Sequence, residues 1–212
     1  MKILIGTTNP SKLRRFKELL SGYDIEFCSL SDLGVTAEPE ECGTTPEENA
    51  AIKARFYGQF CDKVVCNDSG LYFDCLPVSD TRQPGLNIRT PNGTRLDDEQ
   101  MIEYYSSLIS SLGGKVLSYY LDGIAIYNCG EIFTYMEDSD ATRASAFYMV
   151  DKPTTDRNEG WPLDSISINR HTMNYFTDKK DNKYDTTNEN IMLGEYRMRL
   201  RAFMTKALGI EE

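Results

Sequence analysis

The first 20 residues, MKILIGTTNPSKLRRFKELL (residues 1–20), decide how the rest of the chain is interpreted. Their apolar run predicts a short buried strand over residues 2–6. Apolar side chains then recur at helical spacing and predict a helix over about residues 11–20. A polar loop lies between these two elements and places Lys12 at the start of the helix. A strand that leads directly into a helix in this way indicates an α/β protein.

The bulk composition bounds the class of protein. With 212 residues, 40% of them hydrophobic and 26% charged, the chain is long enough for one well-buried α/β domain or for a domain with a small lobe. Its formal charge of −10 argues against a nucleic-acid partner, because contact with a phosphate backbone requires an excess of lysine and arginine. A small polyanionic ligand is still allowed, since one cation in a cleft acts locally.

Targeting and redox signals give a simple expectation. No apolar run approaches the roughly 20 residues that are needed to span a bilayer, and the first apolar run is too short for the core of a signal peptide. The six cysteines form no C-x-x-C pair, so we expect reduced thiols that are mostly buried. These features predict a cytoplasmic protein without a membrane partner.

Periodicity and turn signals predict the remaining elements. Thr45 is expected to cap a helix that has Pro46 at its first position. Residues 177–188 are polar and charged, which predicts a mobile segment. The other predicted elements are strands at residues 25–27, 63–66, 71–76, 115–121, 123–127, 131–136 and 144–150, helices at 97–112 and 190–208, and loops at 36–45 and 77–95. Their order predicts an α/β fold with a mixed sheet, in a single two-lobed domain over residues 1–212.

Two polar clusters stand at predicted helix starts. The first is Thr-Thr-Asn-Pro-Ser-Lys at residues 7–12, where backbone amides could form an anion nest to which Lys12 adds a positive charge. The alternative is an ordinary capped turn with a solvated lysine. The second cluster places Glu48 near Lys53 on one helix, so that a carboxylate could hold a metal and an ammonium a phosphate. The alternative is an acid that only stabilises the helix dipole.

A third polar cluster, Asn67-Asp68-Ser69-Gly70, follows a predicted buried strand. Asp68 would then lie at the carboxyl edge of the sheet, where ligands usually bind, although a tight Asx turn explains the same residues. Taken together, the three clusters supply what magnesium-assisted cleavage of a phosphoanhydride requires. Oxygen ligands bind the cation, lysines neutralise phosphoryl oxygens, and a carboxylate prepares water.

These motifs carry a resemblance to a known family. The strand with Thr-Thr-Asn-Pro-Ser-Lys, then TPEENAAIKAR at residues 45–55, then Asn-Asp-Ser-Gly-Leu at residues 67–71, resemble the inosine triphosphate pyrophosphatases, also called non-canonical purine nucleoside triphosphate pyrophosphatases. Their order and spacing match over about the first 90 residues. Pro84-Gly85 through Arg89 is similar to a shortened form of a further family loop.

The resemblance implies a fold, a reaction and a set of roles. The fold would be an elongated α/β structure with a substrate cleft between two lobes, usually in a homodimer. The reaction would be hydrolysis of a nucleoside triphosphate to the monophosphate and pyrophosphate, with Mg²⁺. Lys53 would help to neutralise the phosphates, Glu48 would bind the metal, and Asp68 would bind the metal or orient the attacking water. Contacts to the substrate would come from Thr8, Asn9, Lys12, Ser69 and Arg89.

The chain departs from the family pattern at three places. Asn67 stands where the family usually has the first of two adjacent acids, and we expect Asp68 to suffice as the second. Trp161, in Glu-Gly-Trp-Pro-Leu-Asp at residues 159–164, is either a stacking platform for the base or a core tryptophan. Glu195-Tyr196-Arg197 aligns with a Ser-His-Arg run that reads the purine 6-oxo group. Arg197 would then donate to a keto oxygen, with Tyr196 beside it, or else Arg197 is a surface cation.

The sequence thus predicts an enzyme that hydrolyses ITP, dITP and XTP and cleanses the nucleotide pool. Two alternatives stay open: the same phosphate site with a different nucleotide substrate, or a nucleotide-binding module with weak catalysis or none. The departure at Asn67 favours the nucleotide-binding module, whereas changes near the expected base pocket favour a different nucleotide substrate.

Overall fold

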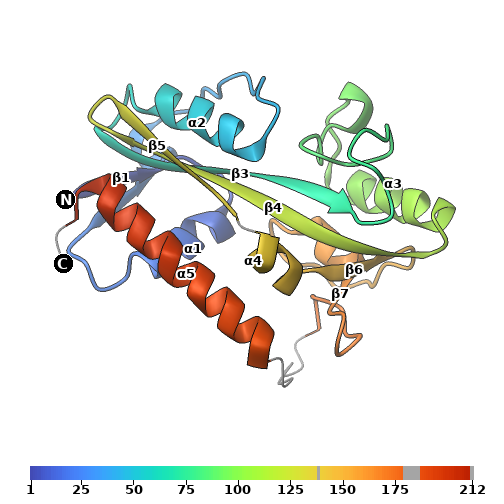
Figure 1. The fold of residues 1–212 in the computed structure, drawn as a ribbon. Helices are drawn as coiled ribbons and strands as arrows, with labels where there is room; N and C mark the ends of the chain where they lie inside the picture. The colour runs from blue at the N-terminus through green and yellow to red at the C-terminus, as the bar shows by residue number, and fades with distance from the viewer. Residues whose placement is uncertain (138, 179–186, 211–212) are drawn as a thin grey trace. The chain divides into compact units, whose positions relative to one another are not determined.

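The computed structural model describes residues 1–137, 139–178 and 187–210. Its strands form a seven-stranded sheet in the order β2-β1-β3-β4-β6-β7, with β5 paired to β4 (Figure 1). The strands are β1 (Lys2–Ile5), β2 (Glu26–Ser29), β3 (Lys63–Phe73), β4 (Lys115–Asn128), β5 (Glu131–Met136), β6 (Phe147–Val150) and β7 (Ser167–Ile168). The α-helices are α1 (Pro10–Leu19), α2 (Pro46–Tyr57), α3 (Asp98–Ser111), α4 (Ser139–Ala144) and α5 (Thr187–Leu208).

The sheet is mixed, as the sequence predicts. β1 pairs in parallel with both β2 and β3. β4 pairs antiparallel with β5 and with β6, and β6 pairs antiparallel with β7. The predicted α/β class is therefore confirmed. None of the described helices combines the length and the apolar character that crossing a bilayer would require.

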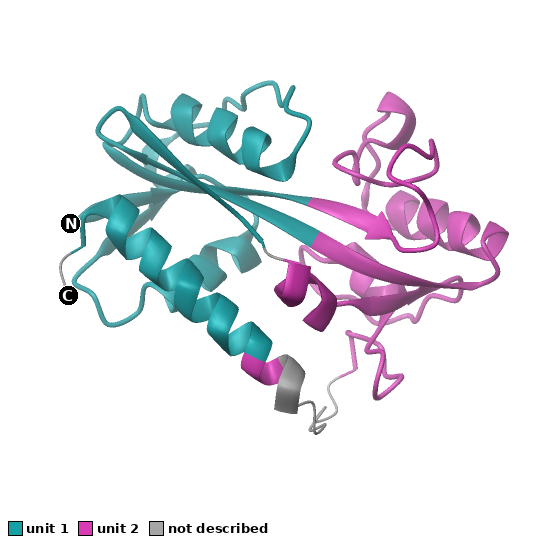
Figure 2. Ribbon diagram, viewed as in Figure 1, with its two compact units in different colours: residues 1–69, 121–138, 192–212 teal, residues 70–120, 139–191 magenta. Residues whose placement is uncertain are grey.

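The chain divides into two compact units, which Figure 2 shows in different colours. Unit 1 contains residues 1–69, 121–138 and 192–212, and unit 2 contains residues 70–120 and 139–191. Strands β3 and β4 contribute residues to both units. The assignment of the whole chain to one domain with a cleft between two lobes stays a prediction.

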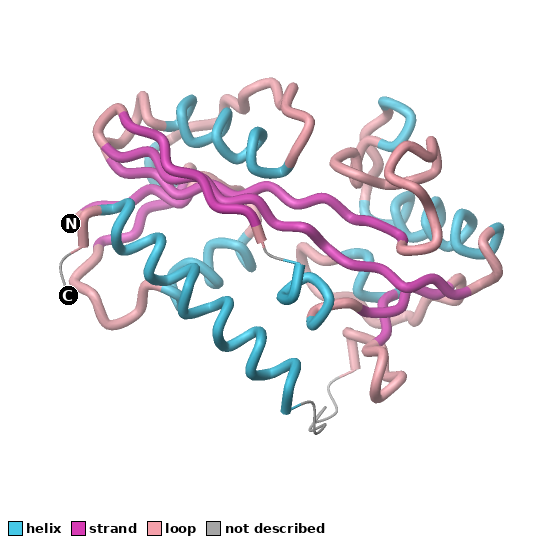
Figure 3. Tube along the Cα trace, in the orientation of Figure 1, coloured by secondary structure: helices cyan, strands magenta, loops and turns pink. Residues whose placement is uncertain are grey.

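In unit 1, helices cover both faces of the sheet. Helix α2 lies on one face, and α1 and α5 lie on the other (Figures 1 and 3). Ala50 and Ala54 of α2 are fully buried against a cluster that includes Leu4 of β1 and Val64 of β3. Small alanine side chains allow this helix to lie close to the strands, and burial of the apolar cluster stabilises the arrangement by roughly 25 cal/mol per Å² of apolar surface.

Gly123 of β4 permits the closest of these approaches. A Cβ atom at this position would lie 2.2 Å from the backbone nitrogen of Glu47 and 2.4 Å from the carbonyl carbon of Pro46. Real Cβ atoms do not come so close to backbone atoms. The first turn of α2 therefore rests directly on β4 because position 123 has no side chain.

Helix α5 is fastened to the sheet near its C-terminus. Lys63 Nζ donates to the carbonyl oxygen of Leu208 at 2.5 Å and to Asn128 Oδ1 at 2.7 Å. Asn128 in turn donates to the carbonyl oxygen of Ala207 at 2.9 Å. These bonds satisfy carbonyl groups at the helix end that have no partner within the helix.

Unit 2 has its own apolar core. Leu71 and Phe73 of β3, Tyr105 and Ile109 of α3, and Met149 of β6 are fully buried in a single cluster. A capping box begins α3, in which Asp97 accepts from the backbone of Gln100 and Gln100 accepts from the backbone of Asp97. The periodicity of this segment therefore predicts both the helix and its buried face.

Several predicted elements are confirmed within one or two residues. They are the strands at 2–6 and 131–136, the helices at 11–20 and 97–112, and the helix capped by Thr45, whose hydroxyl accepts from the backbone nitrogen of Glu48 at 3.1 Å. The predicted C-terminal helix over 190–208 is present and begins earlier, at Thr187. Of the predicted mobile segment at 177–188, residues 179–186 lie outside the described part of the chain.

Three sequence predictions are wrong, and two of them share one cause. The strands predicted at 63–66 and 71–76 are one strand, because residues 67–70 continue β3, and residues 115–127 form one strand, β4, in place of two. Both sites carry turn-forming residues whose side chains find partners across the sheet, and these tertiary contacts override local turn preference. The predicted strand at 144–150 is shorter, because residues up to Ala144 form helix α4, and β7 was not predicted.

Candidate functional site

The loop after β1 forms a capped helix start. Asn9 Oδ1 accepts from the backbone nitrogens of Ser11 at 2.9 Å and Lys12 at 3.4 Å, and the backbone nitrogen of Asn9 donates to Thr7 Oγ1 at 3.1 Å. Pro10 occupies the first helical position, as favoured at helix starts. Since Asn9 occupies two of the amides that would form an anion nest, the charged group that this loop offers to a ligand is the side chain of Lys12.

Lys12 lies among four charged groups of unit 1. Burial lowers the pKa of Lys12, the carboxylates of Asp122 and Asp68 oppose that shift, and Lys53 and Arg15 reinforce it. Within the described residues, Lys12 forms no ion pair shorter than 4 Å. A half-buried ammonium without a close carboxylate is a suitable partner for an anionic ligand.

Asp68 of β3 is held by residues of α2. Lys53 Nζ lies 2.8 Å from Asp68 Oδ1, and Asn49 Nδ2 donates to Asp68 Oδ2 at 3.2 Å. Lys53 also pairs with Glu41 at 2.9 Å. Burial alone would lower the pKa of Lys53, but the facing carboxylates of Asp68 and Glu41 outweigh it, so the pKa is raised and the ammonium stays charged.

Asp122 of β4 is the centre of a second group of contacts. Arg15 of α1 donates to Asp122 Oδ2, and Ser69 of β3 donates to Asp122 Oδ1, both at 2.5 Å. The side chain of Asp122 is only 13% exposed. Burial would raise the pKa of this carboxyl, but Arg15, Lys12 and the Ser69 hydroxyl lower it, so Asp122 remains ionised.

The alternation of β3 explains why two neighbouring residues join different groups. Successive side chains of a strand point to opposite faces, so Asp68 contacts α2 on one face and Ser69 contacts Asp122, the partner of Arg15, on the other. β1 ends at Ile5, whereas β3 continues beyond the pairing of Ile5 with Val65. Helix α1 begins five residues after β1 ends, and Lys12 in its first turn lies close enough to Asp68 and Asp122 for their charges to shift its pKa.

Glu48 lies apart from this cluster of contacts. Its Oε2 accepts from the backbone nitrogen of Thr44 at 2.6 Å and from the Thr44 hydroxyl at 2.8 Å. These bonds lower the pKa of the exposed Glu48 carboxyl. The structure thus shows Glu48 in a local interaction at the helix start, and the neighbouring Asn49 is the residue that contacts Asp68. The metal-binding role of Glu48 stays a prediction.

The aligned C-terminal pair lies on α5. Tyr196 is 4% exposed, and its buried hydroxyl has no hydrogen-bond partner among the described residues. Burial raises the pKa of this phenol well above its ordinary value, and the negative charge of Glu137 adds to the shift. Arg197 is exposed, as expected for the alternative of a surface cation. Their roles in substrate binding stay predictions.

The other predicted contacts fall elsewhere. Thr8 is exposed in the loop before α1. Arg89 and Trp161 belong to unit 2. Arg89 forms an ion pair with Asp98 at 2.8 Å, and Trp161 is half-buried before a short 3₁₀ helix over Pro162–Ile166. For these three residues a role in substrate binding also stays a prediction.

The oxygen atoms of the site suit a hard divalent cation. Asn67 Oδ1 is buried and has no hydrogen-bond partner in the described part of the chain, and the next residue is Asp68. Mg²⁺ is commonly held by one or two carboxylates, with waters and substrate phosphates completing the shell. Among the residues that the structure describes, no group of three or more His, Cys, Asp and Glu side chains is arranged around a common point. Asn67 lies on the Ser69 face of β3, because its Nδ2 donates to Ser69 Oγ at 3.4 Å, whereas Asp68 points to the other face. The protein ligand that fits is therefore the Asp68 carboxylate.

Sequence reasoning missed three residues of the cluster: Arg15, Asp122 and Glu41. Arg15 lies three residues after Lys12 and therefore shares its helix face, which is a signal that helical spacing provides. Asp122 interrupts an apolar run and is followed by glycine, which favoured a break between strands. Glu41 lies in an acidic loop without any local signal for its pairing with Lys53.

Comparison with known proteins adds independent findings. A family model described as the Ham1 family matches residues 3–115. The chain is 44% identical over 87 residues to a dITP/XTP pyrophosphatase of Thermoanaerobacter pseudethanolicus, which is 41% of this chain and 42% of the relative. It is 40% identical over 114 residues to a dITP/XTP pyrophosphatase of Bacillus subtilis, which is 52% of this chain and 53% of the relative. The chain thus matches about half the length of these curated relatives.

Solved structures are similar over almost the whole chain. A HAM1 protein from Coxiella burnetii has a TM-score of 0.67 at 20% identity, covering 98% of this chain and 100% of that one. A nucleoside-triphosphatase, dITP/XTP pyrophosphatase, from Mycobacterium abscessus has a TM-score of 0.61 at 23% identity, covering 95% and 98%. At these identities the likeness establishes the fold.

Proposed function

Because the chain belongs to the Ham1 family, we propose that it hydrolyses non-canonical purine nucleoside triphosphates such as ITP, dITP and XTP to the monophosphate and pyrophosphate. The observation that carries this proposal is the ion pair between Lys53 of α2 and Asp68 of β3 at 2.8 Å, with Lys12 of α1 close enough for both charges to act on its ammonium. Two ammonium groups and a carboxylate are what an anionic phosphate chain and an attacking water need.

In the proposed reaction the lysines bind and orient the phosphates. Lys12 has no close carboxylate partner among the described residues and is the first cation that a phosphate oxygen would meet. Lys53 is already paired with Asp68 and Glu41, so its charge limits the repulsion between the Asp68 carboxylate and the substrate. Ser69 lies beside Asp68 on the same strand and faces the side of the sheet where α1 lies.

Asp68 is the proposed base. It would accept a proton from the water that attacks the α-phosphorus, while the bond between this phosphorus and the oxygen bridging to the β-phosphate breaks and pyrophosphate leaves. Asn49, which donates to Asp68 Oδ2, fixes the plane of the carboxylate and leaves its remaining lone pairs available. A positioned base of this kind contributes typically ~10²–10⁴-fold to a rate.

Mg²⁺ is the proposed cofactor. Asp68 would hold it, and Glu48 would join only if its carboxylate left Thr44. When bound, the ion would neutralise charge on the phosphoryl oxygens. Removing divalent ions with a chelator is expected to abolish pyrophosphate release, and adding Mg²⁺ is expected to restore it.

A substrate panel tests the proposal. Purified protein with Mg²⁺ is given ITP, dITP, XTP, ATP and GTP separately, and pyrophosphate release is measured against time. We expect the first three to be cleaved with the higher kcat/KM. No release from any of the nucleotides would contradict the proposal, and tight binding without turnover would identify a binding module instead.

A second candidate function keeps the phosphate site and changes the base. It is favoured by the surroundings of Tyr196, a buried phenol with no hydrogen-bond partner among the described residues, next to an exposed Arg197. Equal kcat/KM for ITP and for canonical or pyrimidine nucleotides in the same panel would support this candidate. We also propose a cytoplasmic homodimer, and light scattering of the purified protein tests the oligomeric state.

A further inference from the structure

Asp122 connects the cations of α1 to the strand that carries Asp68. It accepts from Arg15 through one oxygen and from Ser69 through the other. Arg15 lies 107 residues away in sequence and Ser69 lies 53 away, so this carboxylate joins three separate segments of unit 1. Its backbone is fixed as well, because its nitrogen donates to Glu137 Oε2 at 3.1 Å and its carbonyl accepts from the Glu137 nitrogen at 2.9 Å.

Arg15 retains donors for a second anion. A guanidinium has five N–H groups, and in the described part of the chain one nitrogen of Arg15 donates to Asp122. The side chain is 37% exposed, whereas that of Asp122 is 13% exposed. Arg15 and Lys12 are three residues apart on α1, and Lys12 is close enough to Arg15 and Asp122 for both charges to shift its pKa. Arg15 can therefore bind a phosphate oxygen without leaving Asp122.

Ser69 is constrained by the same carboxylate. Its single hydroxyl proton points to Asp122 Oδ1, and Asn67 Nδ2 approaches the Ser69 oxygen at 3.4 Å. The next residue toward the N-terminus is Asp68. One buried carboxylate, that of Asp122, thus connects the Arg15 guanidinium to the strand segment that carries the proposed base.

We propose that Asp122 is a positioning residue of the phosphate site, which holds Arg15 beside Lys12 so that Arg15 acts as a further polyphosphate-binding residue. This inference rests on the proposed function for its ligand class. The competing explanation is a buried ion pair that only fastens α1 to the sheet, a role that would appear in stability and not in ligand affinity.

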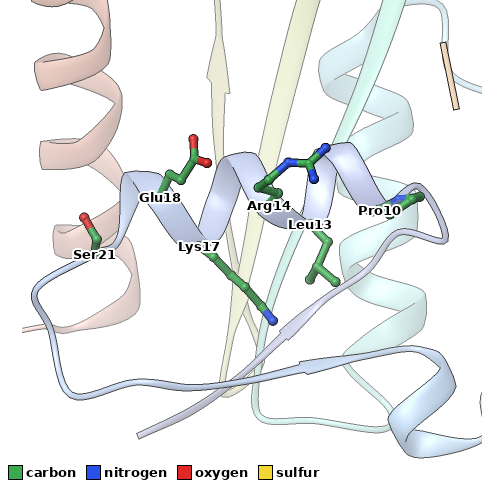
Figure 4. A pocket seen from close by; sticks show the side chains of 6 residues that line it. All are labelled: Pro10, Leu13, Arg14, Lys17, Glu18 and Ser21. Atoms are coloured by element: carbon green, nitrogen blue, oxygen red, sulfur yellow. The ribbon is translucent and has the colours of Figure 1, made fainter. Parts of the chain in front are cut away.

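The experiment measures the binding of inorganic tripolyphosphate by calorimetry, without nucleotide and without turnover. Arg15→Met is expected to weaken binding about tenfold, as loss of one charge-assisted contact does, and Arg15→Lys is expected to fall between this variant and the wild type. Arg14→Met is the matched control, since Arg14 is exposed and donates to Ser11 Oγ. Arg14 lines a groove on α1, called the outer groove, with Pro10, Leu13, Lys17, Glu18 and Ser21 (Figure 4). Arg14→Met is expected to bind as the wild type does.

Asp122→Asn gives a test of sign. If Asp122 only subtracts positive charge from the site, its neutralisation tightens tripolyphosphate binding. If it positions Arg15, binding weakens about tenfold, and the double variant Arg15→Met/Asp122→Asn is no weaker than the weaker single variant, because the two residues act as one unit. Tighter binding by Asp122→Asn, or wild-type binding by Arg15→Met, overturns the proposal. So does a loss of thermal stability in Asp122→Asn with unchanged affinity.

Kinetics separate this inference from the proposed function. In Arg15→Met and Arg15→Lys the KM for the best nucleotide of the panel is expected to rise more than kcat falls. A wild-type protein that binds tripolyphosphate through Arg15 but releases no pyrophosphate from any nucleotide contradicts the proposed reaction and leaves the assignment of Arg15 intact. Nucleotide hydrolysis by Arg15→Met with the same KM and kcat as the wild type contradicts the assignment of Arg15 alone.

Discussion

Strand β3 changes from buried polar to buried apolar side chains within a few residues, where it passes from unit 1 to unit 2. In unit 1 it carries Asp68 and Ser69, whose side chains bind Lys53, Asn49 and Asp122. In unit 2 the same strand carries Leu71 and Phe73, which are fully buried in an apolar core. Unit 1 thus buries charged groups along β3 in addition to its apolar cluster, whereas unit 2 buries apolar side chains along the same strand.

The difference indicates which unit is constrained by chemistry. Burying an apolar side chain stabilises a fold directly, whereas burying a charge costs free energy that its partners only partly return. Burial of groups such as Asp122 and Lys53 therefore adds little to the free energy of unfolding or lowers it. Clusters of buried charged groups are common at functional sites. We expect substitutions in unit 2 to change stability first, and substitutions in unit 1 to change activity first.

The largest expected effect tests the core of unit 2. Phe73→Ala removes a fully buried aromatic ring and is expected to lower the free energy of unfolding by about 3–5 kcal/mol, measured by denaturant titration. The kcat/KM per folded molecule is expected to stay near the wild-type value. Val78→Ala, at a position that is 76% exposed, is the control and should leave stability unchanged. A large loss of kcat/KM in folded Phe73→Ala would break the contrast between the units.

The next effect tests the proposed base in unit 1. Asp68→Asn keeps the shape of the side chain but removes the proton acceptor, so turnover is expected to fall by ~10² or more. Tripolyphosphate binding should remain close to that of the wild type. Asp140→Asn, which alters an exposed ion pair with Arg143, is the matched control and should retain full turnover. Equal turnover in wild type and Asp68→Asn rules out this mechanism.

A smaller effect is expected at Lys12. Lys12→Ala should raise the KM for the triphosphate about tenfold with a lesser fall in kcat, because a charge-assisted contact to the ligand is lost. Lys17→Ala on the same helix is the control, since Lys17 is exposed along the outer groove of α1 (Figure 4). If both variants show the same KM, the site is not where α1 begins.

The smallest effect concerns the thiols and should leave activity unchanged. Burial raises the pKa of Cys66 to about 12, so almost no thiolate forms at pH 8, whereas Cys42, Cys75 and Cys129 are exposed. Iodoacetamide labelling followed by peptide mass spectrometry should modify the three exposed thiols first. Equally fast labelling of Cys66 would show that the interior of unit 1 opens readily.

The sequence predicted what local patterns encode. Thr45 and Pro46 mark the start of α2, and the spacing of apolar residues marks α1 and α3, because caps and periodicity act within a few residues. Lys12, Lys53 and Asp68 were predicted to share a phosphate site, and the structure pairs Lys53 with Asp68 and leaves Lys12 within reach of their charges. Glu48 accepts from Thr44 in the structure, and its expected metal-binding role stays a prediction.

Contacts between distant segments were beyond local patterns. Arg15 meets Asp122 across 107 residues, and no spacing in the sequence pairs them. The same absence of local information explains the predicted break between the strands at 63–66 and 71–76. Asparagine, aspartate, serine and glycine favour turns in isolation, yet here their partners on α2 and β4 keep the strand extended.

Gly123 has a consequence for how this chain can evolve. The first turn of α2 occupies the space that any larger residue at position 123 would need, and α2 also carries Asn49 and Lys53. Even an added methyl group would displace that turn and, with it, the two side chains that hold Asp68. Position 123 is thus expected to stay glycine in active descendants of this chain, for a reason that involves no contact with substrate. Its invariance would reflect the short distance between α2 and β4.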